Sequence, residues 1–254
     1  GSPQGARPKA LIKFDSTNNR VSTLPTAAGD DWLVKFPARG ENQSVCAAEH
    51  VYAQLAKQCG LNMPDTQFFD LGSGYGAFGV KRFDRDNGMR IHVHTLAGLL
   101  NTNFRLPTLS YTQLLRCIRA LTHSELEVIQ GYRQCVFNVV FHNRDDHSKN
   151  FSFMMDSVGN WALSPAYDLS FNTGLNGEHN MDIMGEGKNI KLKHLLDLAK
   201  NSDIKLATAK GIIEHTVSIA SNLNHDLSHY PIDAALREHI CQHVQKNINR
   251  LKSE

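Results

Sequence analysis

The sequence predicts an α+β fold with two lobes, a β-rich lobe of residues 1–95 and an all-helical lobe of residues 96–254. Up to about residue 95, short runs of alternating apolar and polar residues are separated by Asn, Gly and Pro, which is typical of strands and turns. Beyond that point the apolar residues recur every three or four positions, which indicates amphipathic helices. A polar stretch at residues 143–150 interrupts this second pattern and is the first candidate for a functional loop.

The composition is that of an ordinary globular protein. The 254 residues, 41% hydrophobic and 20% charged, are enough for one large domain or two lobes. A formal charge of +2 indicates no broad surface for polyanions, so we expect no direct binding of nucleic acid. The five cysteines form no CxxC pair. No apolar run approaches the roughly 20 residues of a membrane span, and the start lacks a signal-peptide pattern. We therefore expect a cytoplasmic protein without membrane contact.

The first elements are strands that follow a small, basic opening. Residues 1–9 lead into the alternating run Ala10 to Asp15, and a loop before a strand is able to cradle phosphate with its backbone amides. Arg7 and Lys9 add positive charge, although neither a GxGxxG nor a Walker pattern is present. A flexible terminus is the alternative interpretation. Two more strand-like runs follow, Val21 to Leu24 and Trp32 to Pro37.

A lysine and a glutamate stand out in the next two elements. Lys35 lies within the apolar run, where its ammonium needs an anionic partner or a path to water. Ser44 is a candidate cap for a helix from Val45 to Cys59, and Glu49 lies on the flank of the apolar stripe of that helix. Glu49 can therefore turn inward toward Lys35, the pairing by which protein kinases fix the lysine that contacts the nucleotide phosphates. Taken alone, each residue is better explained by a solvent-facing position, and only their pairing favours the inward one.

Three further strand-like runs and two helices come next. The strands are expected at Gln67–Leu71, Ala77–Phe83 and Met89–His94; without a third ligand nearby, His92 and His94 are interpreted as surface residues. One helix is expected at Tyr111–Leu121, and a longer one begins at Ser124, which forms an S-x-x-E capping box with Glu127. The apolar stripe of the longer helix comprises Leu126, Ile129, Val136, Phe137, Val140 and Phe141, which predicts a buried central helix.

After residue 150 the chain is expected to form a hairpin, a polar segment and three helices. The hairpin consists of Phe151–Met155 and Trp161–Leu163. The segment at residues 173–188 is rich in Gly and Asn and is interpreted as mobile near the active site. The helices are expected at Ile190–Lys200, Leu206–Leu223 and Asp233–Leu251.

The strongest signal is the order of Asp145, Asn150 and Asp168. Protein kinases place a catalytic carboxylate, an amide five residues later and a second acid after a short hairpin in this order. Phosphoryl transfer needs one carboxylate to accept the proton of the incoming hydroxyl, which suits Asp145, and hard oxygen ligands for Mg²⁺, which suits Asn150 and Asp168. A polar turn without function would not explain Asp168. The sequence therefore predicts a protein-kinase-like fold that uses ATP and Mg²⁺.

On these residues the chain resembles the HipA family of bacterial serine/threonine kinases, best known as toxins of toxin–antitoxin modules. The resemblance extends over Ser2–Lys9, Leu33–Pro37, Glu49–Asp65, Val80–Arg85, Asp145–Phe153 and Pro165–Asp168. It implies that Asp145 is the catalytic residue. The ATP site that it implies comprises Gln4, Gly5, Ala6, Arg7, Pro8, Lys9, Lys35, Glu49, Lys81, Arg82, Phe83, His147, Ser148, Lys149, Asn150, Tyr167 and Asp168.

The resemblance also implies roles within that set. Residues 4–9 would form a phosphate loop, residues 81–83 would form the hinge against which adenine packs, and Asn150 and Asp168 would hold the metal. Ser2 matches a serine that family members autophosphorylate, and the added negative charge would repel the phosphates of ATP. The implied substrate is a protein, such as an aminoacyl-tRNA synthetase or another translation component, and the implied partner is a DNA-binding antitoxin.

Two features depart from the family pattern. Asp146 replaces a glycine of the founding toxin, so it is either a further metal ligand or a like charge that raises the pKa of Asp145. The strand that should precede the phosphate loop is missing, so we expect either that upstream sequence has been removed or that a separate small chain supplies it.

Two other functions are compatible with parts of the sequence. A metal-dependent nuclease or phosphohydrolase would use Asp145, Asp146 and His147, with His142 as a further candidate, but it leaves the lysine and glutamate pair without a role. A catalytically dead kinase-fold module that binds an antitoxin would not need the intact motifs that the chain retains.

Overall fold

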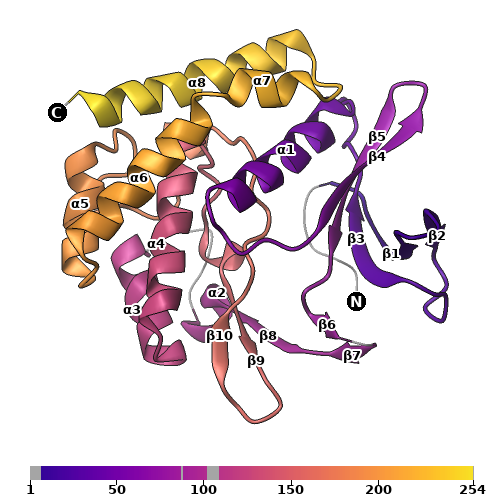
Figure 1. The fold of residues 1–254 in the computed structure, drawn as a ribbon, viewed down its shortest axis with the longest axis horizontal. Coiled ribbons are helices and arrows are strands. Elements are labelled where there is room, and N and C mark those ends of the chain that lie inside the picture. Colours follow the sequence, from indigo (N-terminus) through magenta and orange to yellow (C-terminus); the bar gives the residue numbers. More distant parts are fainter. Residues whose placement is uncertain (1–6, 87, 102–108, 254) are drawn as a thin grey trace.

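The computed structural model describes residues 7–86, 88–101 and 109–253. A β-rich part and a mostly helical part lie on either side of the α1 helix, Ser44–Gln58 (Figure 1). The predicted two-lobed α+β fold is confirmed. The boundary near residue 95 stays a prediction.

The β-rich part is built on a five-stranded antiparallel sheet with the order β2-β1-β3-β5-β4. Its strands are β1 Lys9–Asp15, β2 Arg20–Ser22, β3 Asp30–Lys35, β4 Thr66–Gly72 and β5 Tyr75–Lys81. One face packs on α1, and on the other Phe14, Trp32 and Phe69 meet edge to face with ring centroids 5.1 to 6.4 Å apart. Because side chains alternate along β3, Lys35 lies on the face opposite Trp32 and contacts Glu49 of α1.

The predicted strand Met89–His94 is divided between two small sheets. β6 Arg85–Asp86 pairs with β7 Met89–Arg90, whereas β8 His92–Thr95 pairs with β9 Ser152–Met155, which in turn pairs with β10 Trp161–Leu163. The expected hairpin after residue 150 is therefore present and gains β8 as a third strand. Since this sheet packs with the helices, the C-terminal part is not purely helical (Figure 1).

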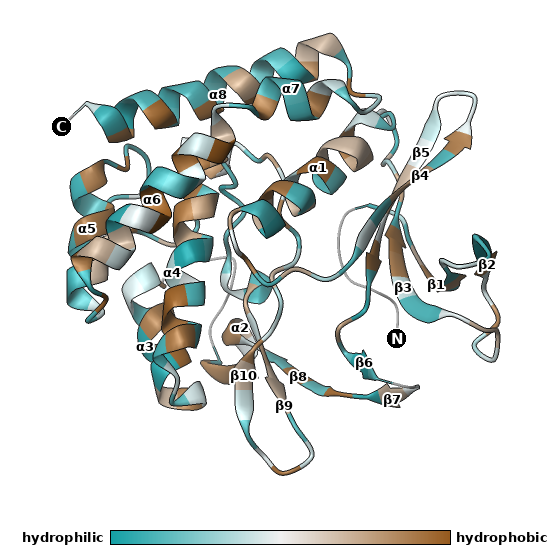
Figure 2. Cartoon of the chain, in the orientation of Figure 1, coloured by the Kyte–Doolittle hydropathy of each residue, from teal (hydrophilic) through white to brown (hydrophobic). Residues whose placement is uncertain are grey.

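The helices follow the expected order with shifted ends. They are α2 Leu96–Leu99, α3 Tyr111–Thr122, α4 Glu125–Val140, α5 Leu192–Asn201, α6 Leu206–Ala220, α7 Leu223–Ser228 and α8 Ala234–Lys252, with 3-10 turns at Ser148–Asn150 and Leu175–Gly177. The helix expected to run to Leu223 ends at Ala220, and α7 is separate. In Figure 2, α8 alternates hydrophobic and hydrophilic residues, as expected for a helix with one buried face.

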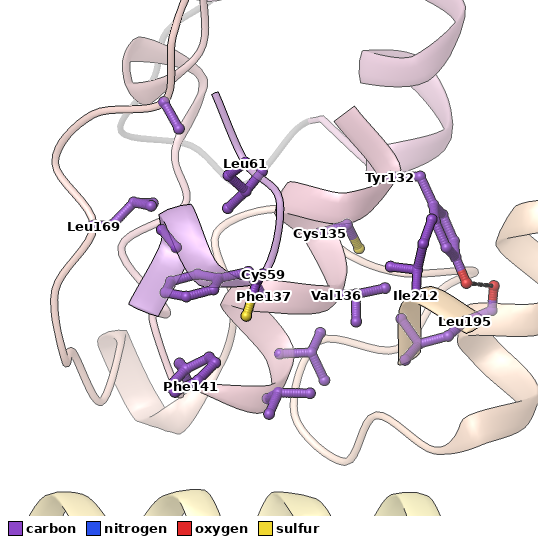
Figure 3. Close-up of a cluster of buried hydrophobic side chains, with 14 of the residues drawn as sticks. Cys59, Leu61, Tyr132, Cys135, Val136, Phe137, Phe141, Leu169, Leu195 and Ile212 are labelled. Carbon is purple, nitrogen blue, oxygen red and sulfur yellow. Dashed lines mark hydrogen bonds between the residues drawn. The ribbon is translucent and has the colours of Figure 1, made fainter. Parts of the chain in front are cut away.

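α4 is the centre of the core, as its apolar stripe predicted. Tyr132 and Phe137 are fully buried, Phe137 stacks on Phe141 at 4.5 Å, and the Tyr132 hydroxyl donates a hydrogen bond to the Leu195 carbonyl (Figure 3). Ser124 caps the helix by accepting a hydrogen bond from the Glu127 amide. Leu126 was wrongly assigned to the buried stripe, since it is 77% exposed in the first turn.

The start of α1 also differs from expectation. Gln43, not Ser44, occupies the cap position, and the Ser44 amide donates to Asn42 Oδ1. The Ser44 hydroxyl instead accepts a hydrogen bond from the Asp233 amide at 3.0 Å and lies 3.4 Å from the Pro231 carbonyl. The helix that carries Glu49 is thereby tied to the residues that precede α8.

Candidate active site

Two adjoining cavities of about 280 and 190 Å³ lie where the five-stranded sheet faces the C-terminal part. Leu33, Val80 and Tyr167 line both cavities, so the two form one cleft. The larger cavity is also lined by Leu11, Lys81, Arg82, Phe83 and Asp84, and the smaller one by Lys9, Lys35, Glu49, Ala53, Met63, Phe78, Asp168 and Leu169. The cleft thus has a mainly apolar end and a charged end.

The predicted hinge lies at the apolar end. The Phe83 and Tyr167 rings are 5.6 Å apart with an interplanar angle of 35°, which offers aromatic surface to a flat ligand. The backbone amides of Lys81 and Arg82 donate to the carbonyls of Asp65 and Asp31, so they are not available to an adenine edge. Of the three hinge residues, Phe83 therefore offers the packing surface.

Lys35 at the end of β3 is the centre of the charged end. Its Nζ lies 2.5 Å from Glu49 Oε1 and 2.5 Å from Asp168 Oδ1. Burial opposes charge on the ammonium, but the two carboxylates outweigh it and raise the pKa of Lys35. The predicted pairing of the strand lysine with the helix glutamate is therefore present in the structure, and Asp168 joins it.

Two residues of the predicted phosphate loop approach the same carboxylates. Arg7 Nη1 lies 3.6 Å from Glu49, and Arg7 Nε donates to Glu41 at 2.8 Å. Lys9 lines the smaller cavity. Pro8 accepts a backbone hydrogen bond from Phe36, which joins the loop to the end of β3. Ser2, Gln4, Gly5 and Ala6 lie outside the described residues, so their predicted roles stay predictions.

The loop at residues 143–150 carries Asp145 near the charged end of the cleft, within reach of the charges of Lys35 and Asp168. Asn150 donates through Nδ2 to the Asp145 carbonyl at 2.8 Å, which closes the loop on itself. The Asp145 side chain is 46% exposed, and His147 Nε2 lies 3.7 Å from its Oδ1. Partial burial raises the pKa of Asp145, His147 lowers it, and Asp168 and Asp146 raise it further. A carboxyl with a raised pKa is a better proton acceptor than an ordinary aspartate.

Tyr167 and Asp168 are fastened beside this loop. The Tyr167 hydroxyl lies 2.6 Å from both the Lys149 carbonyl and Ser152 Oγ. Asp168 adopts a left-handed backbone with φ of 57°, uncommon for a residue other than glycine and frequent at functional sites. Burial opposes ionisation of Asp168, but Lys35 outweighs it and lowers the pKa of the carboxyl. Asp168 is therefore an anion at neutral pH.

The oxygen atoms present fit a magnesium ion. Since Asn150 uses its nitrogen for the Asp145 carbonyl, its Oδ1 is left for a ligand. Asp168 uses Oδ1 for Lys35, which leaves Oδ2. Amide and carboxylate oxygens are the hard donors that Mg²⁺ prefers, and this metal usually takes only one or two protein carboxylates. Asn150 and Asp168 would thus hold the ion between them.

Asp146 has a structural place that the sequence did not reveal. Its carboxylate is buried and accepts hydrogen bonds from the Tyr111 hydroxyl at 2.7 Å, from His179 Nδ1 at 2.8 Å and from the Asn180 amide at 2.8 Å. The alternative in which Asp146 is a metal ligand is not supported, because its fully buried carboxylate already accepts three hydrogen bonds and lines neither cavity of the cleft. Its like charge does raise the pKa of Asp145, as the other interpretation held.

Among the described residues, the candidate ligands of a hydrolytic metal site do not gather into a cluster. His142 is buried, stacks on Phe171 at 5.6 Å, and lies 3.0 Å from the Asn247 amide through Nδ1. Burial lowers the pKa of His142 to about 3. Across residues 7–86, 88–101 and 109–253, no three His, Cys, Asp or Glu side chains gather as metal ligands.

None of the helices in these residues combines the length and the apolar character of a membrane span.

The fold and the cleft together define a protein with a protein-kinase-like architecture. A lysine from a strand, a glutamate from a helix and an acid from the second motif meet in one cluster, with a carboxylate loop beside it. A family profile described as the HipA-like C-terminal domain matches residues 1–223, so the chain belongs to the HipA family.

The chain is also similar to proteins of known sequence or structure. The protein named "Putative kinase Y4dM" of Sinorhizobium fredii is 28% identical over 190 residues, which are 65% of this chain and 46% of that protein. Shewanella oneidensis HipA, solved with HipB and operator DNA, matches with a TM-score of 0.71 at 20% identity over 98% of this chain and 64% of its own. The Helicobacter pylori kinase CtkA matches with a TM-score of 0.60 at 15% identity, over 95% of this chain and 94% of its own. The chain thus spans about half of the first relative, and the solved structures establish the fold.

Proposed function

We propose that the chain is the kinase part of a bacterial toxin–antitoxin protein that transfers the γ-phosphoryl group of ATP to a serine or threonine hydroxyl of a protein. The contact of Lys35 with both Glu49 and Asp168 carries this proposal. A metal-dependent hydrolase has no use for a buried lysine held between two carboxylates. A kinase needs this lysine at the α- and β-phosphates and the second acid at the metal.

The cleft suits each part of the nucleotide. Adenine would pack against Phe83 and Tyr167 at the apolar end, and the phosphates would lie at the charged end near Lys35 and Lys9. A Mg²⁺ ion on Asn150 and Asp168 would neutralise charge on the phosphates. When Asp168 turns to the metal, Lys35 keeps Glu49 as its partner and directs its remaining protons to the phosphate oxygens.

Asp145 would accept the proton of the attacking hydroxyl. The hydroxyl oxygen forms a bond to the γ-phosphorus while the bond to the bridging oxygen of ADP breaks, and the proton passes to a carboxylate oxygen of Asp145. Asn150 orients this residue through the Asp145 carbonyl. His147, 3.7 Å away, favours the ionised acceptor.

Regulation and partners follow from the family and from the loop at the start of the chain. We propose that Arg7 leaves the glutamates for the phosphates of ATP, and that a phosphate on Ser2 would prevent this by repelling the phosphates of ATP.

By analogy with HipA in its complex with HipB and operator DNA, a DNA-binding antitoxin is the proposed partner in the bacterial cytoplasm. A translation component such as an aminoacyl-tRNA synthetase is the proposed substrate. A separate small chain that adds to the β-rich part is a further proposed partner.

The test is transfer of radiolabelled γ-phosphate from ATP and Mg²⁺ by the wild-type protein and Asp145→Ala, with intact mass spectrometry of the products. Label on the protein or on an added target, lost in the variant, supports the proposal and shows whether Ser2 is modified. Transfer that persists in Asp145→Ala contradicts the assigned role. A wild-type protein that neither binds ATP nor transfers phosphate would instead support an interaction module.

A further inference from the structure

The two neighbours of Asp145 are both anchored in one segment, residues 173–189, which we name the return segment. On one side the Asp146 carboxylate accepts hydrogen bonds from His179 Nδ1 and from the Asn180 amide, both at 2.8 Å. The side chains of Asp146 and His179 are 0% and 2% exposed. This hydrogen bond lies in the protein interior, where packing holds its geometry and water does not compete for it.

On the other side of Asp145, Arg144 is fixed by the same segment. Its guanidinium donates to the carbonyls of Gly177 and Lys188, and the Asn180 side chain donates to the Arg144 carbonyl at 2.8 Å. Gly174 has a φ of 71°, and a Cβ atom added there would lie 2.8 Å from Arg144 Cβ. The segment therefore packs against the loop without a gap.

A third element holds the same carboxylate from behind. The Tyr111 hydroxyl donates to Asp146 Oδ2 at 2.7 Å and accepts from Asn138 Nδ2 at 2.9 Å. Asn138 Oδ1 accepts from Asn143 Nδ2, so the chain of hydrogen bonds returns to the first residue of the loop. The loop at residues 143–150 is thus held by α3, by α4 and by the return segment.

This arrangement decides where Asp145 points. Because Arg144 and Asp146 are both buried, the Asp145 side chain between them points outward and is 46% exposed. Neither Asp146 nor His179 lines the two cavities of the cleft. A change in their contact would therefore displace the proton acceptor without touching the groups that surround the nucleotide.

We propose that Asp146 and His179 are a positioning pair that holds Asp145 at the attacking hydroxyl and couples it to the return segment. His179 acts through Asp146 and contacts no substrate. The inference rests on the proposed phosphoryl transfer, because it names what fixes the proton acceptor of that reaction. Movement of the return segment, for example when a protein substrate or partner contacts it, would then alter the rate of transfer without altering ATP affinity.

The test compares His179→Ala and the isosteric Asp146→Asn with the wild-type protein. We expect kcat to fall about 100-fold, the cost of a misplaced reacting group, while the Kd for ATP changes less than about twofold. His179→Gln should recover part of the lost kcat, because its amide can donate to Asp146 from a similar position. His225→Ala, a change at a histidine on α7 remote from the loop, is the matched control and should leave kcat unchanged.

Hydrogen–deuterium exchange supplies a readout that does not depend on activity. In His179→Ala the amides of residues 143–150 should exchange faster, whereas those of β3 and α1 should not. A kcat lowered together with ATP affinity, or unchanged exchange in residues 143–150, would overturn the inference. If the wild-type protein transfers no phosphate, the proposed function fails, and the exchange data still decide whether His179 holds the loop.

Discussion

Replacing Lys35 with methionine tests the charged cluster through folding stability. The substitution removes an ammonium that lies 2.5 Å from Glu49 and from Asp168. Glu49 is 2% exposed and cannot regain water, whereas Asp168 is 43% exposed and can. Breaking a buried pair by removing one partner costs about 3–5 kcal/mol, and Arg7 at 3.6 Å from Glu49 offsets a part of it. We therefore expect Lys35→Met to lower the free energy of unfolding by about 3 kcal/mol at pH 7.

A double-mutant cycle with Glu49→Gln separates this cost from a simple loss of packing. In Lys35→Met/Glu49→Gln no buried carboxylate is left without a cation, so most of the loss should be recovered. The matched control is Lys57→Met, which breaks an exposed pair with Asp65 and should cost at most about 1 kcal/mol. Urea unfolding followed by fluorescence gives each value. The reasoning is refuted if Lys35→Met costs as much in the Glu49→Gln background as in the wild type.

Three further predictions concern acid stability, the metal motif and the buried carboxylate. Burial lowers the pKa of His142 to about 3, below the pKa of a histidine in the unfolded chain. The neutral imidazole therefore stabilises the fold fully above about pH 6.5, and this stability is lost as the pH falls toward 3. Between pH 7 and 5, the urea midpoint of His142→Asn should fall less steeply than that of the wild type. Asp168→Ala should abolish phosphotransfer and the Mg²⁺ dependence of ATP binding, which calorimetry measures. The variant should stay folded, because Lys35 keeps its contact with Glu49. ATP binding that still depends on Mg²⁺ in the variant would exclude Asp168 as a metal ligand. Tyr111→Phe removes one donor to Asp146 and should lower the free energy of unfolding by about 1–3 kcal/mol, and an unchanged urea midpoint would contradict the assigned hydrogen bond.

The parts of the site that were predictable from sequence are those with local patterns. The order of Asp145, Asn150 and Asp168 is readable because a loop and a hairpin fix their relative places over a short stretch of chain. Lys35 and Glu49 were readable because a charged residue next to an apolar stripe needs a partner. In both cases residue type and periodicity carry the information.

The contacts that depend on distant pairing were not predictable. Asp146 and His179 are 33 residues apart, and His179 lies in a Gly- and Asn-rich segment without periodicity. The pattern around Tyr111 indicates a helix but not that its hydroxyl turns toward a carboxylate. β8 was expected as a strand, yet alternation specifies no partner, so its pairing with β9 emerges only in the fold.

The bond between Ser44 and Asp233 has a consequence for how the cleft opens. α1 is fixed to the C-terminal lobe at its first residue by the Ser44 hydroxyl, which accepts from the Asp233 amide at 3.0 Å, and two residues earlier Asn42 donates to the Asp233 carboxylate at 2.5 Å. Near the middle of α1, the Tyr52 hydroxyl donates to the Phe141 carbonyl at 2.8 Å. Because the buried Tyr52 hydrogen bond is lost only together with the packing around it, we expect α1 to move with the C-terminal lobe. The sheet would then be the moving part, and it would slide over Glu49 rather than carry that residue away. Entry and exit of nucleotide would then make and break the contact between Glu49 and Lys35 through movement of β3.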